Sequence, residues 1–296
     1  MLTGANGIVG KEIANRLINN KEYELFLLSN SKINIKNKKK KIKLLKQDLT
    51  KPIRFQLKTD VIIHCAAKNP LSKKGNDMKS IYEKNLKITK NLIKFSNENS
   101  VKKMIFLSSV NVYGLIKKKI VTENFKPNKP CLYGKSKFFS EKLFNEKKNK
   151  FKTISLRIPG VLALNLSRNQ PLMVNMVKKI INGENVYAYN LNSKFNNITD
   201  SYEIAKFINI ILRKKNIKTS IYNFSASRPM QVMHVINLIK RIFKSRSKVI
   251  QKKLNKSSFV ISNKKIKNDF NIKISTTKNI ITRCCRKILK ADYKIA

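Results

Sequence analysis

Tyr133 and Lys137 are spaced to work as an acid–base pair. They lie four residues apart in Tyr133-Gly134-Lys135-Ser136-Lys137, so on a helix their side chains share one face. Tyrosine has a pKa near 10 in model peptides, and proton transfer at neutral pH needs it lowered by about three units, or about 4 kcal/mol. One ammonium about 4 Å away supplies about that much at an effective dielectric of 20. The spacing is therefore chemically sufficient.

This spacing is not specific, because 65 of the 296 residues are Lys or Arg. It recurs at two other places, Tyr113 with Lys117 and Tyr202 with Lys206. Only Tyr133 is expected to open a helix, and it follows a strand that ends in hydroxyls, Leu107-Ser108-Ser109. A serine there could hydrogen-bond the substrate oxygen that Tyr133 protonates or deprotonates. We therefore predict a catalytic trio of Ser109, Tyr133 and Lys137; outside that context the pair would be a surface contact.

A glycine loop stands at the start of the chain, in Thr3-Gly4-Ala5-Asn6-Gly7-Ile8-Val9-Gly10. Gly4 allows a tight turn, Gly7 lets the backbone approach a diphosphate, and Gly10 lets the following helix pack close to the sheet. The amino-terminal amides of that helix then face the anion. A plain turn is the alternative, but the surrounding βαβ pattern favours a dinucleotide loop.

The elements that must position these residues alternate along the first half of the chain. Apolar runs predict strands at 23–28, 60–64, 103–108 and 152–158, and helical patterns lie between them at 7–20, 77–98 and 133–149. Such alternation predicts an α/β fold with a Rossmann-type, doubly wound parallel sheet. Further elements are expected at 170–183, 186–189, 200–214, 220–225, 230–244 and 276–290.

These elements suggest two domains. We expect an NAD(P)-binding Rossmann domain at 1–158, completed by 184–216, and a smaller substrate-binding lobe made of 159–183 and 217–296. The first strand is short, since only Met1 and Leu2 precede Thr3. Losing about four residues of a central strand removes several backbone hydrogen bonds at about 1 kcal/mol each. We therefore expect either a start further upstream or a markedly unstable chain.

The composition limits the classes of partner. The formal net charge is +49, which suits nucleic-acid binding. Lysine is abundant here together with isoleucine and asparagine, however, as in a general compositional bias. We therefore expect no nucleic-acid partner and interpret the dense run from Lys36 to Lys43 as a solvated loop. Neither a membrane span nor a signal peptide is apparent. The four cysteines show no paired or zinc-binding spacing. A reduced cytoplasm is the expected location, with no bound metal.

Taken in order, the motifs resemble those of the extended short-chain dehydrogenase/reductase family, in particular its NAD-dependent epimerase/dehydratase branch acting on nucleotide sugars. They are the glycine loop, Asp48-Leu49, His64-Cys65-Ala66-Ala67, Asn85-Leu86, Ser108-Ser109-Val110-Asn111-Val112-Tyr113-Gly114, Tyr133 to Lys137, Leu156-Arg157-Ile158-Pro159-Gly160, Phe259-Val260-Ile261-Ser262 and Asn268-Asp269-Phe270. Nearly the whole chain is covered.

The resemblance implies a site for NAD or NADP. In it Asp48 would hydrogen-bond the adenine, Leu49 would cover it, Asn85 would hold the strand ends, and Lys137 would also bind the nicotinamide ribose. The full set of implied cofactor residues is Gly4, Asn6, Gly7, Ile8, Val9, Gly10, Asp48, Leu49, Ala66, Ala67, Asn85, Tyr133, Lys137 and Pro159. His64 is expected to be a satisfied strand-end histidine, and Tyr113 shapes the substrate pocket or is structural.

Two departures from the family pattern narrow the chemistry. Family members that eliminate water carry an acidic pair after the catalytic hydroxyl, where this chain has Val110 and Asn111, so dehydration is not expected. The second strand ends in Leu28-Ser29-Asn30-Ser31-Lys32, without an acid for the ribose 2′-hydroxyl. That composition leans towards NADP, although other loop residues could compensate.

The expected function is that of an NAD(P)-dependent oxidoreductase/epimerase acting on a nucleotide-diphosphate sugar, with hydride transfer at a sugar carbon, in polysaccharide synthesis; the sequence does not choose between an epimerase and a reductase. Two alternatives stay open: an NADP-dependent 4-keto-sugar reductase, and a non-catalytic NAD(P)-binding regulatory protein. By the resemblance, the helices near 77–98 and 133–149 would form a homodimer interface, although their lysines would face like charges.

Overall fold

A seven-stranded sheet organises the first of two compact units in this computed structural model. The structure describes residues 1–33, 41–69, 77–162, 172–252 and 258–290, and the first unit takes Met1–Gly114, Pro127–Arg157 and Ser201–Tyr222. Its strands are β1 (Leu2–Thr3), β2 (Leu25–Ser29), β3 (Ile42–Lys46), β4 (Val61–His64), β5 (Lys103–Ser109), β7 (Lys152–Ile158) and β12 (Ser220–Asn223). Their order is β12-β7-β5-β4-β1-β2-β3.

The sheet reverses its winding at β1. This strand pairs in parallel with β2 on one side and with β4 on the other, and the β4–β5 and β2–β3 pairs are also parallel. In such open sheets, ligands bind beyond the carboxyl ends of the strands where the order reverses. The ends of β1, β4 and β5 carry Thr3, His64 and Ser109, so three of the predicted motifs gather at one edge.

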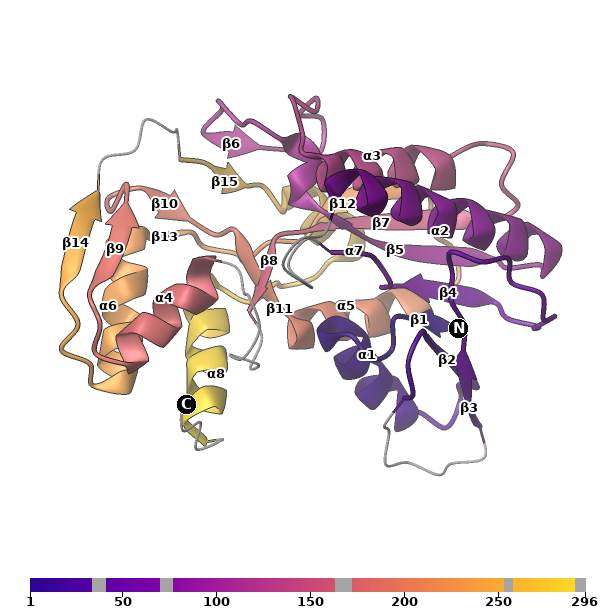
Figure 1. The fold of residues 1–296 in the computed structure, drawn as a ribbon, viewed down its shortest axis with the longest axis horizontal. Helices are drawn as coiled ribbons and strands as arrows, with labels where there is room; N and C mark the ends of the chain where they lie inside the picture. The colour runs from indigo at the N-terminus through magenta and orange to yellow at the C-terminus, as the bar shows by residue number, and fades with distance from the viewer. Residues whose placement is uncertain (34–40, 70–76, 163–171, 253–257, 291–296) are drawn as a thin grey trace. The chain divides into compact units, whose positions relative to one another are not determined.

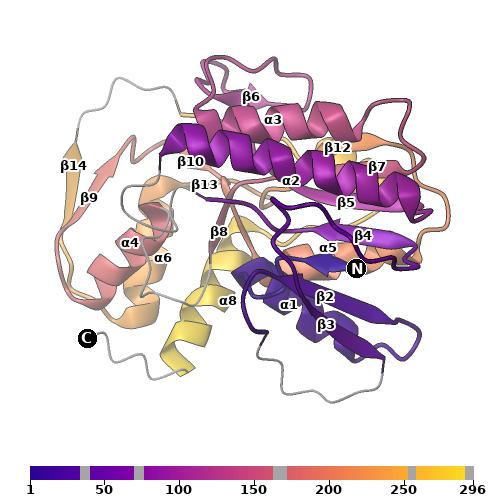
Figure 2. The ribbon, with the colours of Figure 1, turned by 45° about the vertical axis from the view of Figure 1, so that its right-hand side comes forward.

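Helices cover both faces of this sheet (Figures 1 and 2). α2 (Met78–Glu98) packs beside α3 (Leu132–Phe144), and α1 (Ile8–Ile18) packs beside α5 (Ser201–Arg213). α2 turns Ile88, Leu92 and Phe95 into a core shared with Phe106 of β5. Asp77 caps the start of α2 by accepting hydrogen bonds from the backbone of Lys79 and Ser80, which satisfies amides that a helix start leaves free.

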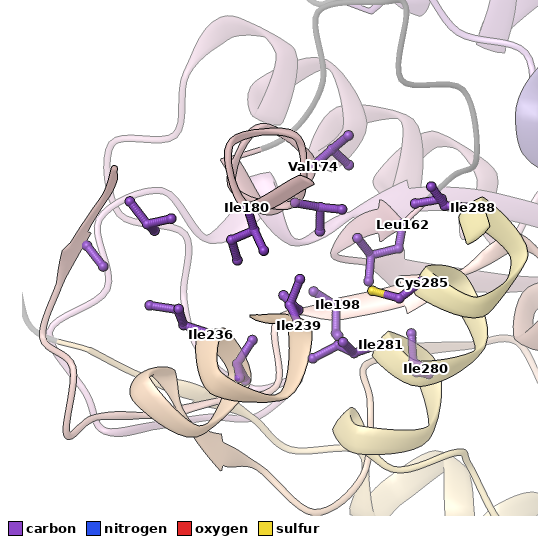
Figure 3. Close-up of a cluster of buried hydrophobic side chains, with 14 of the residues drawn as sticks. Leu162, Val174, Ile180, Ile198, Ile236, Ile239, Ile280, Ile281, Cys285 and Ile288 are labelled. Carbon is purple, nitrogen blue, oxygen red and sulfur yellow. The ribbon is translucent and has the colours of Figure 1, made fainter. Parts of the chain in front are cut away.

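The second unit takes Leu115–Lys126, Ile158–Asp200 and Asn223–Ala296. Its helices are α4 (Leu172–Ile181), α6 (Val232–Phe243), α7 (Lys264–Phe270) and α8 (Thr277–Lys290), and its strands are β6 (Ile120–Val121), β8 (Gly160–Leu162), β9 (Val186–Tyr189), β10 (Lys194–Phe195), β11 (Ile198–Asp200), β13 (Met230–Gln231), β14 (Val249–Lys252) and β15 (Val260–Ile261). Figure 3 shows Val174, Ile239, Ile281 and Cys285 converging from α4, α6 and α8 onto one apolar core.

The sheet confirms the predicted α/β Rossmann-type fold class. Within the seven-stranded sheet one strand was missed: β3 begins at Ile42, so the end of the lysine run interpreted as a loop is strand, while 34–40 lie outside the described residues. Its lysines point outward on an edge strand, where charged side chains are common. In the second unit, the short strands β6, β8, β10, β11, β13, β14 and β15 were not predicted either. The boundaries also differ, because β9 pairs with β14 in the second unit and the first unit resumes at Ser201.

Candidate active site

The glycine loop is packed so closely that a side chain would not fit at Gly4 or at Gly10. Gly4 has φ +73°, and a Cβ placed there would lie 2.7 Å from the backbone nitrogen of Ala66. A Cβ on Gly10 would lie 2.2 Å from the carbonyl oxygen of Gly4. Gly10 thus lets α1 pack against the loop itself rather than only against the sheet. Because these positions carry no side chains, the loop backbone can come as close to a diphosphate as its binding requires.

The start of α1 is open to an anion. Gly7 is its N-cap residue and supplies no side-chain cap, and no acidic residue lies in the first turn. Asn6, Gly7 and Ile8 are exposed, and Val9 is half-buried. A helix start of this kind presents unpaired amides and a partial positive charge. The residues present therefore fit the dinucleotide that the sequence implies, because its diphosphate would meet unpaired amides at this helix start.

The segment after β4 is fixed to α2 by Asn85. Asn85 is 5 % exposed; its Oδ1 accepts from the Lys68 backbone nitrogen at 2.8 Å and its Nδ2 donates to the Lys68 carbonyl at 3.1 Å. The same nitrogen donates to Ser136 Oγ of α3 at 3.1 Å. Asn85 therefore ties the segment that contains the half-buried Ala66 and Ala67 to α2 and α3.

Asp48 and Leu49 follow β3, next to β2. Asp48 Oδ1 accepts from the backbone nitrogen of Thr50 at 2.9 Å and from its hydroxyl at 2.8 Å. These hydrogen bonds, helped by Lys68 and Lys51, lower the pKa of Asp48, so it is a carboxylate that can accept from a ligand. Leu49 is 6 % exposed and packs in the core, which is more buried than a residue that covers an adenine need be.

Tyr133 and Lys137 lie one turn apart on α3, and the ammonium of Lys137 is 5.9 Å from the centroid of the Tyr133 ring. Lys137 is 4 % exposed, and its Nζ donates to the Leu107 carbonyl of β5 at 2.9 Å. Ser109, two residues further along β5, is 9 % exposed, and its Oγ accepts from the Asn111 backbone nitrogen at 3.2 Å. The structure thus brings the predicted trio to the carboxyl end of one strand.

Gly134 makes this approach possible. The residues after Ser109 form a single 3-10 turn, η2 (Val110–Tyr113), against which α3 packs. A Cβ on Gly134 would lie 2.1 Å from the Asn111 carbonyl oxygen. The glycine beside Tyr133 is therefore a contact point between α3 and η2, a role that the spacing of Tyr133 and Lys137 did not indicate.

The pKa of Tyr133 shifts in the direction opposite to the one predicted from its spacing to Lys137. Burial, with a smaller contribution from Cys131, raises the pKa of Tyr133 to about 12, where we expected Lys137 to lower it. Burial also lowers the pKa of Lys137 to about 8, against the opposing effects of Cys65 and Glu141. Desolvation disfavours both charged forms, and the ammonium is directed at a carbonyl. In this state Tyr133 is a neutral phenol at pH 7.

A buried ionic network behind the trio was not foreseen. Glu141 Oε1 accepts from Ser108 Oγ at 2.5 Å, and Glu141 Oε2 lies 2.7 Å from Arg157 Nη2. The Arg157 guanidinium also stacks 4.8 Å from the centroid of the Tyr113 ring. A signal was present, because Glu141 continues the four-residue spacing of Tyr133 and Lys137 along one helix face.

Other predicted residues are placed as follows. His64 Nδ1 lies 2.8 Å from Thr3 Oγ1, and burial followed by Lys137 lowers its pKa, so it is a satisfied neutral histidine as expected. Tyr113 is fully buried. Pro159 is buried between β7 and β8 and belongs to the second unit. Along the described ranges, no helix is long and apolar enough to cross a bilayer, and no three His, Cys, Asp or Glu side chains cluster to bind a metal.

Comparison with known proteins gives a consistent family. Residues 1–225 match the family described as NAD dependent epimerase/dehydratase. An uncharacterized protein of Methanocaldococcus jannaschii is 24% identical over 272 residues, which cover 84% of this chain and 82% of that protein. The N-acetyl-alpha-D-glucosaminyl-diphospho-ditrans,octacis-undecaprenol 4-epimerase of Escherichia coli O157:H7 is 31% identical over 144 residues, 48% of this chain and 43% of the enzyme.

Solved structures share the fold over nearly the whole chain. The UDP-glucose 4-epimerase of Thermotoga maritima, with UDP-glucose, aligns with a TM-score of 0.80 at 17% identity and covers 98% of both chains. The enzyme WbmG of Bordetella bronchiseptica, in complex with NAD and UDP, also aligns at 0.80, with 16% identity, covering 98% of this chain and 94% of that one. At such identities the likeness establishes the fold.

Proposed function

The chain belongs to the NAD-dependent epimerase/dehydratase family, and from that premise we propose that it is an NAD(P)-dependent epimerase of a nucleotide-diphosphate sugar. The observation that carries the proposal is the hydrogen bond from the buried Lys137 to the Leu107 carbonyl of β5. Lys137 lies one helix turn from Tyr133, and Leu107 lies two residues before Ser109. Removing a hydroxyl proton and returning it requires these three side chains, Lys137, Tyr133 and Ser109.

In the proposed mechanism the sugar hydroxyl loses its proton to the Tyr133 oxygen while its carbon, by the family resemblance usually C4, loses a hydride. When bound, NAD(P) would supply the chemistry of accepting this hydride and giving it back on the opposite face of the sugar carbon. Ser109 donates a hydrogen bond to the substrate oxygen throughout. Tyr133 then returns the proton, so that the substrate is inverted at one carbon with no net oxidation.

Tyr133 must be ionised to accept that proton. Its pKa is about 12 in the ligand-free site, so this pKa has to be lowered for catalysis at neutral pH. Positive charge favours the phenolate. Lys137, buried 5.9 Å from the centroid of the Tyr133 ring, is the source of that charge that this chain supplies. We therefore assign Lys137 two roles, holding the nicotinamide ribose and stabilising the Tyr133 phenolate.

The substrate class follows from the relatives. The Thermotoga maritima UDP-glucose 4-epimerase was solved with UDP-glucose and the enzyme WbmG with NAD and UDP. A strongly basic chain would attract such an anion. We extend this class to the present chain, with the second unit as the lobe that holds the sugar.

The experiment that tests the proposal is incubation of the purified protein with UDP-glucose and, separately, with UDP-N-acetylglucosamine. We expect the C4 epimer to appear by proton NMR until both sugars are at equilibrium, without net consumption of cofactor. A reductase would instead consume one reduced cofactor for each 4-keto sugar. Neither conversion, tested over a panel of nucleotide sugars, would overturn the enzyme assignment.

A further inference from the structure

The end of β2 faces the glycine loop and carries an unusual set of side chains. The two hydrogens of Asn6 Nδ2 are shared among four oxygens within hydrogen-bond distance: Ser29 Oγ at 3.0 Å, Ser31 Oγ at 2.9 Å, and the carbonyl oxygens of Ser31 and Lys32 at 3.3 and 2.8 Å. Ser29 is 9 % exposed, whereas Ser31 and Lys32 are exposed. The exposed Asn6 amide therefore fixes the segment after β2 against the dinucleotide loop.

This arrangement leaves hydrogen-bond donors directed to an outside acceptor. The Asn6 amide nitrogen donates and does not accept, so neither serine hydroxyl can give its own hydrogen to it. The two oxygens lie 3.5 Å apart, so at most one hydrogen is used between them. At least one hydroxyl, together with the Lys32 ammonium, is then available to a ligand.

A second cation lies on the neighbouring strand. Ser29 of β2 is the register partner of Lys46 of β3, and partners in adjacent strands point to the same face of a sheet. Lys46 is exposed. No acidic residue occurs in 4–10, 29–33 or 42–47, and within the described chain neither Lys32 nor Lys46 has a carboxylate partner.

In a Rossmann fold this position meets the adenosine ribose: an acid there accepts from the 2′-hydroxyl of NAD, and a cation accommodates the 2′-phosphate of NADP. We infer that Ser29, Ser31, Lys32 and Lys46 form a binding site for the 2′-phosphate, so that this chain prefers NADP(H) over NAD(H). The inference rests on the proposed function, because it concerns the same dinucleotide.

The test is direct titration of the purified full chain with NADPH and with NADH, followed by nicotinamide fluorescence. The chain has no tryptophan, so the nicotinamide signal stands alone. We expect NADPH to bind about tenfold more tightly or better, equivalent to about 1.4 kcal/mol. Adenosine 2′,5′-bisphosphate should likewise displace NADPH at lower concentration than adenosine 5′-monophosphate does.

Variants separate this site from general positive charge. Lys46→Ala should weaken NADPH binding several-fold and leave NADH binding unchanged, and Ser31→Asp should reverse the preference. Lys43→Ala is the matched control: it lies on the same strand, but its ammonium is 5.3 Å from the Phe26 ring centroid and 3.2 Å from Glu24 Oε1. It should change neither affinity.

Two results would count against the inference in different ways. If NADH binds as tightly as NADPH, or if Lys46→Ala and Lys43→Ala have equal effects, the 2′-phosphate site is refuted while the proposed epimerase stands. If neither dinucleotide binds the folded protein, the proposed function is refuted and this inference with it.

Discussion

Arg157 and Glu141 form an ion pair in the interior of the first unit. Arg157 Nη2 lies 2.7 Å from Glu141 Oε2, and the two side chains are 4 % and 1 % exposed. The pair joins β7 to α3, and through Ser108 it also reaches the end of β5. The strand that ends in Ser109 and the helix that carries Tyr133 are thus held together by one carboxylate.

Neutralising that carboxylate should therefore destabilise the protein. Glu141→Gln leaves the Arg157 charge buried without its partner, which typically costs about 3–5 kcal/mol. Urea unfolding at pH 7 measures the loss. Asp60→Asn is the control, because Asp60 and Lys102 form a surface pair at 2.8 Å with side chains 72% and 75% exposed, and such pairs contribute about 0–1 kcal/mol. Equal losses in the two variants would contradict the structural role of the buried pair.

Removing the Tyr133 hydroxyl should abolish turnover and spare cofactor binding. Tyr133→Phe keeps the ring and deletes the group that exchanges the proton, and general acid–base catalysis typically contributes about 10²–10⁴-fold to the rate. Steady-state kinetics and a dinucleotide titration on the same preparation separate the two effects. Tyr202→Phe is the control, since its ring lies in α5 under Arg16. Unchanged turnover in Tyr133→Phe would remove this residue from the mechanism.

The sequence was sufficient for the features that depend on local pattern. The apolar runs of β2, β4, β5 and β7 and the glycine triplet are visible because strand burial and tight turns constrain consecutive residues. Edge strand β3 was missed because half its surface faces water, so its lysines and leucines give no continuous apolar run.

Features that depend on burial could not be predicted from spacing. The direction of the Tyr133 pKa shift is set by desolvation, which a sequence does not measure. The partnership of Glu141 with Arg157 requires α3 and β7 to be packed against each other. Asn6 was predicted as a cofactor residue, and the additional contact of its side-chain amide with the segment after β2 gives no signal in the sequence.

Burial of Lys137 predicts a pH dependence of stability. Its pKa is lowered from 10.5 to about 8, so between these values the unfolded chain binds a proton that the folded chain does not, and the free energy of unfolding rises with pH. Below pH 8 the buried charge is a constant cost, of about 3 kcal/mol. The measurement is urea unfolding of the wild type and Lys137→Met from pH 7 to 10.5. Their difference should change in favour of the wild type across this window; a constant difference would contradict the assigned burial.

Association of two chains through α2 and α3 should strengthen as the salt concentration rises. Phe139 is 40% exposed beside Tyr82 on this face, while Lys84, Lys87, Lys90 and Lys94 are exposed on α2. Like charges would repel across a homodimer, and salt screens that repulsion. Light scattering should therefore show more dimer at 0.5 M than at 0.05 M salt. Phe139→Glu should yield a monomer at both; a dimer unaffected by it would place the interface elsewhere.

The glycine loop offers the most local test of the dinucleotide site. Gly10→Ala would place a Cβ 2.2 Å from the Gly4 carbonyl oxygen, and because the neighbour is backbone, α1 must shift, which typically costs about 1–3 kcal/mol. The same shift should weaken NAD(P)H binding at least tenfold. Gly183→Ala is the control: it has φ +72° and open space around it, so it adds backbone strain of about 1–2 kcal/mol without touching the loop. We expect both variants to melt below the wild type and only Gly10→Ala to lose affinity. If both bind the dinucleotide as the wild type does, the diphosphate does not lie on this loop.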